Sequence, residues 1–440
     1  SCRRKNSNNM EVVFLLVLVI TMAVALASGY PVAFALPGSA ILSIALAALC
    51  GYLFAGSSDA YFLQGGPGQW LDAGVTNFRG VYWEVERDTL IAIPLFIFMG
   101  IMLERSKVAE DLLVTMAQLF GPIPGGLGIA VVFVGALLAA TTGIVGATVV
   151  AMGLISLPVM LRANYSQSLA TGTIAASGTL GQIIPPSIVL IILADQLSSA
   201  TDQASTIRQA DFKQATGQFS MPSEFGLTST SAGDMFLGAL IPGLILVILY
   251  MAYILILALL HPKSAPPVRF ESKYDTQFII KVTLALVPPL ALIFAVLGSI
   301  IMGVATVNQA GAIGAIGAAI MAGYRLMEGR KHAYTPAIIA LASIATILIL
   351  LSIFDINIKN TRTDGEWLGV ALAGIAVFTL LVAVFWSLWR IYKIDETLNG
   401  VMVETAKTTS LVFIILLGAA MLTAAFRAFG GEDLVREFLS

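Results

Sequence analysis

The sequence predicts an all-α polytopic membrane protein, because its composition and its apolar stretches agree. Of the 440 residues, 58% are hydrophobic and 11% are charged, whereas soluble domains are about 45–50% apolar and about 25% charged. The mean hydropathy is +0.90. About 20 apolar residues cross one bilayer. Long apolar stretches recur along the chain, at 11–28, 31–55, 91–103, 127–161, 169–194, 233–260, 278–323, 335–354, 368–391 and 408–428.

Charge and cysteine content disfavour other classes of protein. The 24 Lys and Arg residues are balanced by 26 Asp and Glu residues, so there is no basic excess for binding nucleic acid. Cys2 and Cys50 cannot form a disulfide framework, and no Cys/His cluster has zinc spacing. His261 and His332 lie beside polar loops, which makes a buried histidine relay unexpected. No organic cofactor is predicted.

The polar loops predict an orientation, because cytoplasmic loops carry an excess of Lys and Arg. Two other loops, 195–232 and 355–367, have few Lys and Arg residues or have them balanced by acidic residues. These loops are predicted to lie on the opposite, non-cytoplasmic side. Stretch 278–323 then starts and ends inside, so it should contain two crossings. Three segments rich in Lys and Arg are predicted to be cytoplasmic: 261–281, 324–332 and 390–407.

Residues 1–9 precede the first apolar stretch and contain Arg3, Arg4 and Lys5. A charged segment before an apolar run resembles a signal peptide. Another span follows the first at once, however, so the favoured interpretation is that Met10 is the true start. Residues 1–9 are then a non-native or disordered tail.

An internal repeat is suggested by two distant segments. Residues 93–103 are followed by Glu-Asp-Leu at 110–112, and residues 411–421 are followed by Glu-Asp-Leu at 432–434. Such repeats are the usual construction of secondary transporters. The apolar region 127–190 follows the first copy, and nothing equivalent follows the second. The sequence therefore predicts an inverted-repeat transporter whose second repeat is truncated here, within a longer native polypeptide.

Two apolar stretches are interrupted in ways that suggest a transport site. Stretch 127–161 contains small and hydroxyl residues at 141–148 but no polar loop, which predicts a re-entrant hairpin with its tip near 142–148. Stretch 169–194 contains Ser-Gly-Thr-Leu-Gly at 177–181 and Pro-Pro-Ser at 185–187. Proline removes a backbone donor and glycine lets the backbone unwind, so this stretch is predicted to be a broken helix.

These interruptions favour a sodium site. Free carbonyls and hydroxyls suit a sodium ion, and helix N-termini suit an anionic substrate. No Asp, Glu, Lys, Arg or His lies within 127–161 or 169–194, whereas a proton pump normally buries an ionisable relay. An intramembrane enzyme would need a nucleophile with a base, which both stretches lack. The competing interpretation is close helix packing by small residues, and it is favoured for Gly311, Gly314 and Gly317.

Three segments carry a resemblance to a known family, namely 93–100, 142–158 and 175–187. They resemble motifs of the large membrane subunit of tripartite ATP-independent periplasmic (TRAP) transporters, and 335–391 resembles the extra hydrophobic insertion of longer variants. The resemblance implies an elevator-type, sodium-driven importer of organic acids in the bacterial cytoplasmic (inner) membrane. It also implies a small membrane subunit and a periplasmic solute-binding protein as partners. A stand-alone sodium-coupled anion symporter without a binding protein is the alternative.

The resemblance implies specific site residues, although the family motifs are incomplete. Thr148 stands where the family has an Asp, and 306–310 lacks the acid of a later motif. Hydroxyl or carbonyl oxygens would bind sodium at Thr142, Gly143, Thr148, Ser177, Gly178, Thr179 and Gly181. The substrate cavity would be shaped by Pro185, Pro186 and Ser187.

The predicted organisation follows from these assignments. The expected parts are the tail 1–9; scaffold helices and the start of repeat 1 at 10–126; the transport unit at 127–194; a polar periplasmic loop at 195–232; linking and scaffold helices at 233–334; the inserted helix pair at 335–391; and the start of repeat 2 at 392–440.

Overall fold

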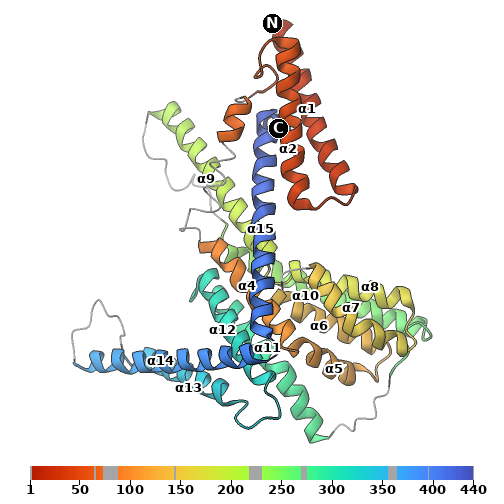
Figure 1. Ribbon diagram of the computed structural model, residues 1–440, viewed down its shortest axis with the longest axis vertical. Coiled ribbons are helices and arrows are strands. Elements are labelled where there is room, and N and C mark those ends of the chain that lie inside the picture. The colour runs from red at the N-terminus through yellow and green to blue at the C-terminus, as the bar shows by residue number, and fades with distance from the viewer. Residues whose placement is uncertain are drawn as a thin grey trace. The chain divides into compact units, whose positions relative to one another are not determined.

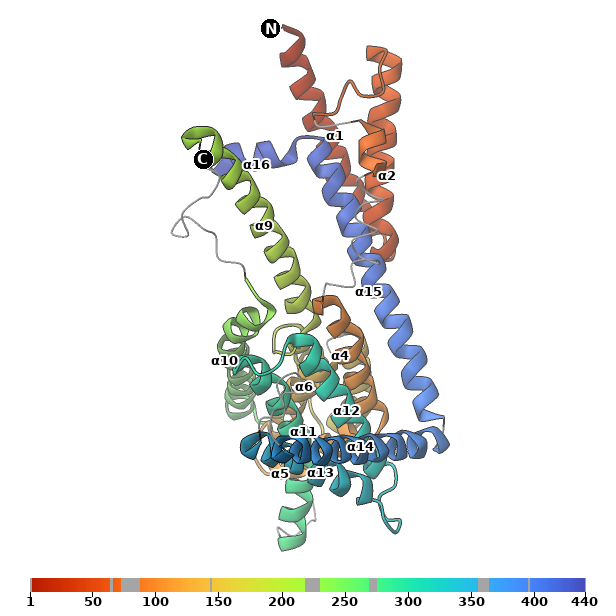
Figure 2. The same ribbon diagram turned by 90° about the vertical axis from the view of Figure 1, so that its left-hand side faces the viewer.

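The computed structural model describes residues 2–63, 66–72, 88–142, 145–217, 230–268, 275–354, 364–394 and 396–439. Across these ranges the regular elements are all helical (Figures 1 and 2). They are α1 (Cys2–Ala27), α2 (Val32–Cys50), the π-helix η1 (Gly51–Ala55), α4 (Asp88–Arg105), α5 (Val108–Phe120), α6 (Gly126–Thr142), α7 (Val145–Arg162), α8 (Gln167–Thr179), the 3-10 helix η2 (Leu180–Gln182), α9 (Ile188–Thr216), α10 (Ala232–Leu260), α11 (Thr276–Ile301), α12 (Val307–Arg325), α13 (Thr335–Ile353), α14 (Asp364–Lys393), α15 (Thr397–Ala428) and α16 (Gly431–Leu439).

The prediction of a polytopic membrane protein is confirmed. Among the described residues, seven helical segments are long and apolar enough to cross a membrane: Met10–Ala27, Val32–Ala55, Ala232–Leu260, Thr276–Ile301, Thr335–Ile353, Trp367–Lys393 and Thr397–Ala428. Their outward side chains are largely Leu, Ile, Val and Phe, as expected where lipid rather than water surrounds a helix. Stretch 278–323 divides into α11 and α12; α11 is one of the seven candidate spans and α12 is not, so the second crossing stays a prediction. The backbone of α1 already begins at Cys2, where the sequence predicts a tail.

The chain divides into two compact units, of which the first contains residues 1–87 and 406–440. Its core is aromatic: the Phe429 ring stacks on Phe62 and Phe14, with centroids 5.4 and 6.1 Å away. The indole of Trp70 donates to the Met421 carbonyl at 3.3 Å. These contacts hold the second copy of the sequence repeat against the segment that follows α2.

The second unit contains residues 88–405 and includes the predicted transport region. Its α4 and α12 pack at close range through glycines. A Cβ added to Gly311 would lie 3.1 Å from Leu95 Cβ, and one added to Gly314 would lie 2.5 Å from the Met99 sulfur. Since missing side chains let backbones approach, this confirms that the glycines serve packing.

The start of α12 explains the incomplete motif at 306–310. Thr306 accepts a hydrogen bond from the Gln309 amide at 3.3 Å, and the Gln309 side chain accepts one from the Thr306 amide at 3.0 Å. This reciprocal arrangement is a capping box, which satisfies backbone donors at a helix start. In this chain the segment therefore begins a helix without needing an acid.

Helices α13 and α14 form an antiparallel pair that lies side by side in both views (Figures 1 and 2). The Ser343 and Thr379 hydroxyls hydrogen-bond across the pair at 2.8 Å. α14 also packs on α12, where Ser387 donates to the Ala319 carbonyl at 2.8 Å. Within the second unit, the pair is therefore held to the other helices through α12.

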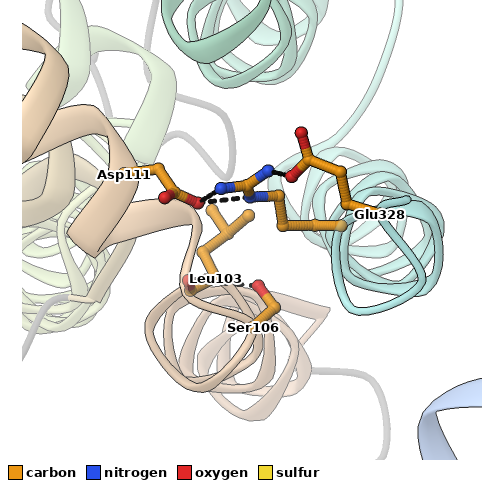
Figure 3. A network of polar contacts seen from close by, with 5 residues as sticks. Leu103, Ser106, Asp111 and Glu328 are labelled. Carbon is orange, nitrogen blue, oxygen red and sulfur yellow. Dashed lines mark hydrogen bonds and ion pairs between the residues drawn. The ribbon is translucent and has the colours of Figure 1, made fainter.

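Two of the three segments predicted to be cytoplasmic, 324–332 and 390–407, make ion pairs within the second unit. Arg105 bonds Glu404, with Nη2 and Oε2 2.7 Å apart, and Arg325 is ion-paired with both Asp111 and Glu328. Figure 3 shows Asp111 approaching from α5 and Glu328 from the segment after α12. These contacts bring the ends of α4 and α12 close to the starts of α5 and α15, while the side of the membrane on which they lie stays a prediction.

Candidate functional site

Helices α6 and α7 form a hairpin whose two ends meet the same loop. The Gly125 amide, before α6, donates to the Ala265 carbonyl at 3.1 Å. The Ser166 amide, beyond α7, donates to the Ser264 carbonyl at 3.0 Å. The hairpin thus begins and ends beside the loop after α10, one of the segments predicted to be cytoplasmic. The structure thus shows a hairpin with both ends at one loop, and its re-entrant course in the membrane stays a prediction.

Tyr165 fixes the base of the hairpin. Its hydroxyl accepts a hydrogen bond at 3.3 Å from the Leu127 amide, one of the first amides of α6, which have no partner within the helix. Burial raises the pKa of Tyr165 to about 12, so the phenol stays neutral at physiological pH. The side chain therefore caps α6 from the far end of the hairpin.

Replacing Tyr165 with phenylalanine is expected to destabilise the protein by about 1–2 kcal/mol, because the buried Leu127 amide loses its acceptor. The thermal unfolding midpoint of the purified protein measures this loss. The control is Tyr253→Phe, since Tyr253 is exposed on α10 and should leave the midpoint unchanged. Equal midpoints for both variants would contradict a capping role for Tyr165.

The predicted broken helix is interrupted where the prolines stand. α8 ends at Thr179, η2 adds one 3-10 turn, and α9 begins only at Ile188. Proline at 185 has no N–H, so the Gly181 carbonyl has no i+4 donor. Ser187 spans the interruption, because its hydroxyl donates to the Gln182 carbonyl at 2.8 Å and accepts from the Leu190 amide at 3.5 Å. The hydroxyl thus caps α9 and ties it to η2.

The interruption packs directly against the hairpin. A Cβ added to Gly135 of α6 would lie 2.7 Å from the Ser177 Cβ. One added to Gly178 would lie 2.3 Å from Val149 Cγ2 and 3.2 Å from the Val149 backbone nitrogen. From the other side, Gly243 of α10 approaches Ile184. A Cβ added to Gly243 would lie 3.1 Å from Ile184 Cγ1. Glycines therefore bring three backbones together at the break.

The predicted site residues are distributed unevenly around this junction. Ser177, Gly178 and Gly181 are buried within it, while Thr179 is exposed. The Ser177 hydroxyl donates to the Ile174 carbonyl at 3.0 Å and keeps its oxygen lone pairs for other partners. Pro185, Pro186 and Ser187 are also buried. The Thr142 side chain and Gly143 lie outside the described residues.

Thr148 occupies a different position from the one predicted. It is buried, and it lines a cavity of about 70 Å³ together with Glu104 and Glu110. Its neighbour Val149 is the residue that meets Gly178. Successive helix residues point about 100° apart, so Thr148 lies beside the α4–α5 turn, and the structure does not bring it to the break.

Glu104 and Glu110 are polar residues near the hairpin that sequence reasoning missed. Burial raises the pKa of Glu104, which lies beyond the apolar stretch 91–103; the Glu404 charge raises it further, and Arg105 opposes this. The Glu-Asp-Leu repeat at 110–112 was the available signal. It marked Glu110 as part of a repeated segment but did not show that Glu110 faces the hairpin, and no sequence signal pointed to Glu104.

The fold defines the class of the chain as a multi-pass helical membrane protein. Comparison with known proteins extends this conclusion: residues 19–207 and 221–354 match the model of the tripartite ATP-independent periplasmic transporter, DctM component. The chain belongs to this family, which confirms the sequence resemblance. The members of this family are transporter permeases rather than enzymes, and the family assignment places the chain with them in the inner membrane. The match includes α13, predicted as part of an insertion, and ends before α14.

Curated relatives agree with the family assignment. The chain is 31% identical over 237 residues to the C4-dicarboxylate TRAP transporter large permease protein DctM of Pseudomonas aeruginosa, which covers 54% of this chain and 47% of the relative. It is 35% identical over 162 residues to the DctM protein of Rhodobacter capsulatus, covering 37% of this chain and 33% of the relative. It is 26% identical over 262 residues to the ectoine TRAP transporter large permease protein TeaC of Halomonas elongata, covering 58% and 49%. The chain spans about half or less of these relatives.

Proposed function

We propose that the chain forms part of the large permease subunit of a sodium-driven TRAP transporter. It would import organic acids or similar small anionic solutes that a periplasmic binding protein delivers, and it would act with a small membrane subunit. The observation that carries the proposal is the junction of two interrupted elements, the α6–α7 hairpin and the α8–α9 break, through Gly135, Ser177 and Gly178.

The junction has the chemistry that a sodium site needs. Among the described residues of the junction, the polar groups are hydroxyls, backbone carbonyls and the uncharged Gln182 amide. The carboxylates of Glu104 and Glu110 lie at the separate Thr148 cavity. Uncharged oxygens at broken helices bind sodium in secondary transporters, and helix N-termini attract anionic solutes. The start of α9, capped by Ser187, is such an N-terminus.

The proposed movement is of the elevator type. The hairpin and α8 would move as one body, because Tyr165 bonds the start of α6 at one end and Ser177 and Gly178 pack on α6 and α7 at the other. Helix α5 would join this body to the scaffold, since its start is ion-paired to Arg325 and its end lies at Gly121, which accepts from the Val268 amide at 2.8 Å. A second copy of the site would come from repeat two. The helices that contain the two Glu-Asp-Leu segments, α5 and α16, support this repeat. Each is preceded by a residue in the left-handed conformation, Lys107 before α5 and Gly430 before α16.

Reconstituted uptake tests the proposal. The full-length native protein is placed in proteoliposomes with its small subunit and binding protein, and uptake of a radiolabelled organic acid is measured. An inward sodium gradient is expected to drive accumulation, while a proton gradient without sodium should not. Accumulation driven equally by protons in sodium-free buffer would reject the ion assignment. Uptake that continues without the binding protein would favour the stand-alone symporter.

A further inference from the structure

One end of the α13–α14 pair gathers aromatic and cationic side chains. The Arg390 guanidinium carbon lies 4.7 Å from the Trp386 ring centroid, and the Lys393 ammonium lies 5.1 Å from that of Trp389. The Tyr392 ring lies 6.5 Å from Trp389. Aromatic and cationic residues at helix ends are typical of the level where lipid headgroups meet hydrocarbon.

The side chains between the two ends of the pair are apolar and outward-facing. Large exposed residues continue along α13 and α14 towards the cationic end, among them Ile338, Leu341, Phe378, Phe385 and Trp389. The backbones of both helices are satisfied within the helices, and Ser343 and Thr379 bond each other. A surface of this kind is suited to contact with lipid chains.

The loop between α12 and α13 adds positive charge to the same end. The Arg390 side chain donates to the carbonyls of His332 and Ala333, at 3.1 and 3.0 Å. This fixes the end of α14 against the loop that carries Arg330 and Lys331, whose side chains are exposed. Three exposed cations, on Arg330, Lys331 and Lys393, therefore border the apolar surface.

Two described carboxylates lie close to these cations in the sequence, Glu328 and Glu396. Glu328 is ion-paired with Arg325, and Arg325 also holds Asp111 (Figure 3). Glu396 follows α14 in the direction of α15. Since Arg390 is buried and held by loop carbonyls, it positions the cluster, while the three exposed cations are available to an anionic ligand.

We propose that this end of the α13–α14 pair binds the headgroup of an anionic phospholipid from the inner leaflet. Arg330, Lys331 and Lys393 would contact the phosphate, Trp389 and Tyr392 would lie at the glycerol level, and the acyl chains would lie along α13 and α14. Basic clusters between helices on the cytoplasmic side bind anionic headgroups in this way. The charge and the adjoining apolar surface together favour a lipid over a soluble anion.

Lipid binding by the purified full-length protein tests this site. Native mass spectrometry measures the binding of added phosphatidylglycerol and, separately, of phosphatidylcholine. The triple variant Arg330→Gln, Lys331→Gln, Lys393→Gln is compared with a control that loses the same charge on the same predicted side, Lys263→Gln, Lys281→Gln, Lys407→Gln. We expect phosphatidylglycerol affinity to fall at least tenfold in the first variant and to change little in the second.

Four outcomes would overturn the proposal. One is an equal loss in both variants, and another is equal affinity of the native protein for phosphatidylcholine. The third is displacement of the bound lipid by millimolar inorganic phosphate, which would indicate a site for a free anion. Unfolding midpoints measured in phosphatidylcholine alone should match between the two variants, because all six side chains are replaced at polar positions. A lower midpoint in the first variant only would mean that the cations have a structural role and would also count against the proposal.

Discussion

Replacing Gly178 with valine is expected to abolish sodium-driven uptake by the full-length transporter. The new Cβ would lie 2.3 Å from Val149 Cγ2 and 3.2 Å from the Val149 backbone nitrogen, so the end of α8 must move away from the hairpin. Overpacking of this kind typically costs about 1–3 kcal/mol, and the same displacement would separate the proposed sodium ligands. A loss of about 2 kcal/mol in ion binding lowers the affinity roughly 30-fold.

Gly172 provides the matched control, because it lies on the same helix and no atom is within 4 Å of its added Cβ. Gly172→Val should retain most of the uptake rate, and both proteins should insert in the membrane to similar levels. Uptake by the Gly178→Val protein at the rate of Gly172→Val would contradict the importance of the junction. The assay is initial-rate uptake in proteoliposomes under a fixed sodium gradient.

Replacing Gly323 with valine is expected to detach α14 from α12. An added Cβ would coincide with the Ser387 hydroxyl and lie 3.2 Å from the Ser387 Cα, and the hydrogen bond from Ser387 to Ala319 would break. A backbone this close cannot be relieved by a rotamer change. We expect a loss of about 3 kcal/mol or more in the free energy of unfolding, from overpacking together with the lost hydrogen bond.

Gly374→Val serves as the comparison, since Gly374 is on α14 and its added Cβ meets nothing within 4 Å. The unfolding midpoint of the purified protein and the protease sensitivity of the α13–α14 pair should change for Gly323→Val alone. Equal unfolding midpoints for the two variants would show that the close contact between α12 and α14 does not stabilise the fold.

Much of the helical arrangement could be predicted, because the bilayer imposes length and polarity on each span. Pro185 and Pro186 marked the break between α8 and α9, and the glycines of α12 were correctly assigned to packing. Segment boundaries were less predictable: α9 continues as a helix to Thr216, through residues whose polarity suggested a loop from 195 onwards. Polarity marks where a chain leaves lipid, not where its helix ends.

The candidate site was only partly predictable from sequence. Ser177 and Gly178 could be placed at an interruption because proline and glycine act locally on the backbone. The direction in which Thr148 points depends on how α7 rotates against α8, and Val149 rather than Thr148 meets Gly178. The cavity beside Glu104 likewise depends on how the α4–α5 turn packs on the hairpin. These are contacts between distant segments, which local pattern does not specify.

Sodium binding measured directly on the purified full-length protein tests the central claim, that uncharged oxygens where the hairpin meets the broken helix hold the driving ion. Equilibrium binding of radiolabelled sodium is compared between the native protein and the double variant Ser177→Ala, Thr179→Ala, with Thr171→Ala as a control on the exposed face of α8. We expect saturable binding whose affinity falls about tenfold or more in the double variant, equivalent to about 1.4 kcal/mol. Unchanged affinity in that variant, with the control behaving like the native protein, would contradict it.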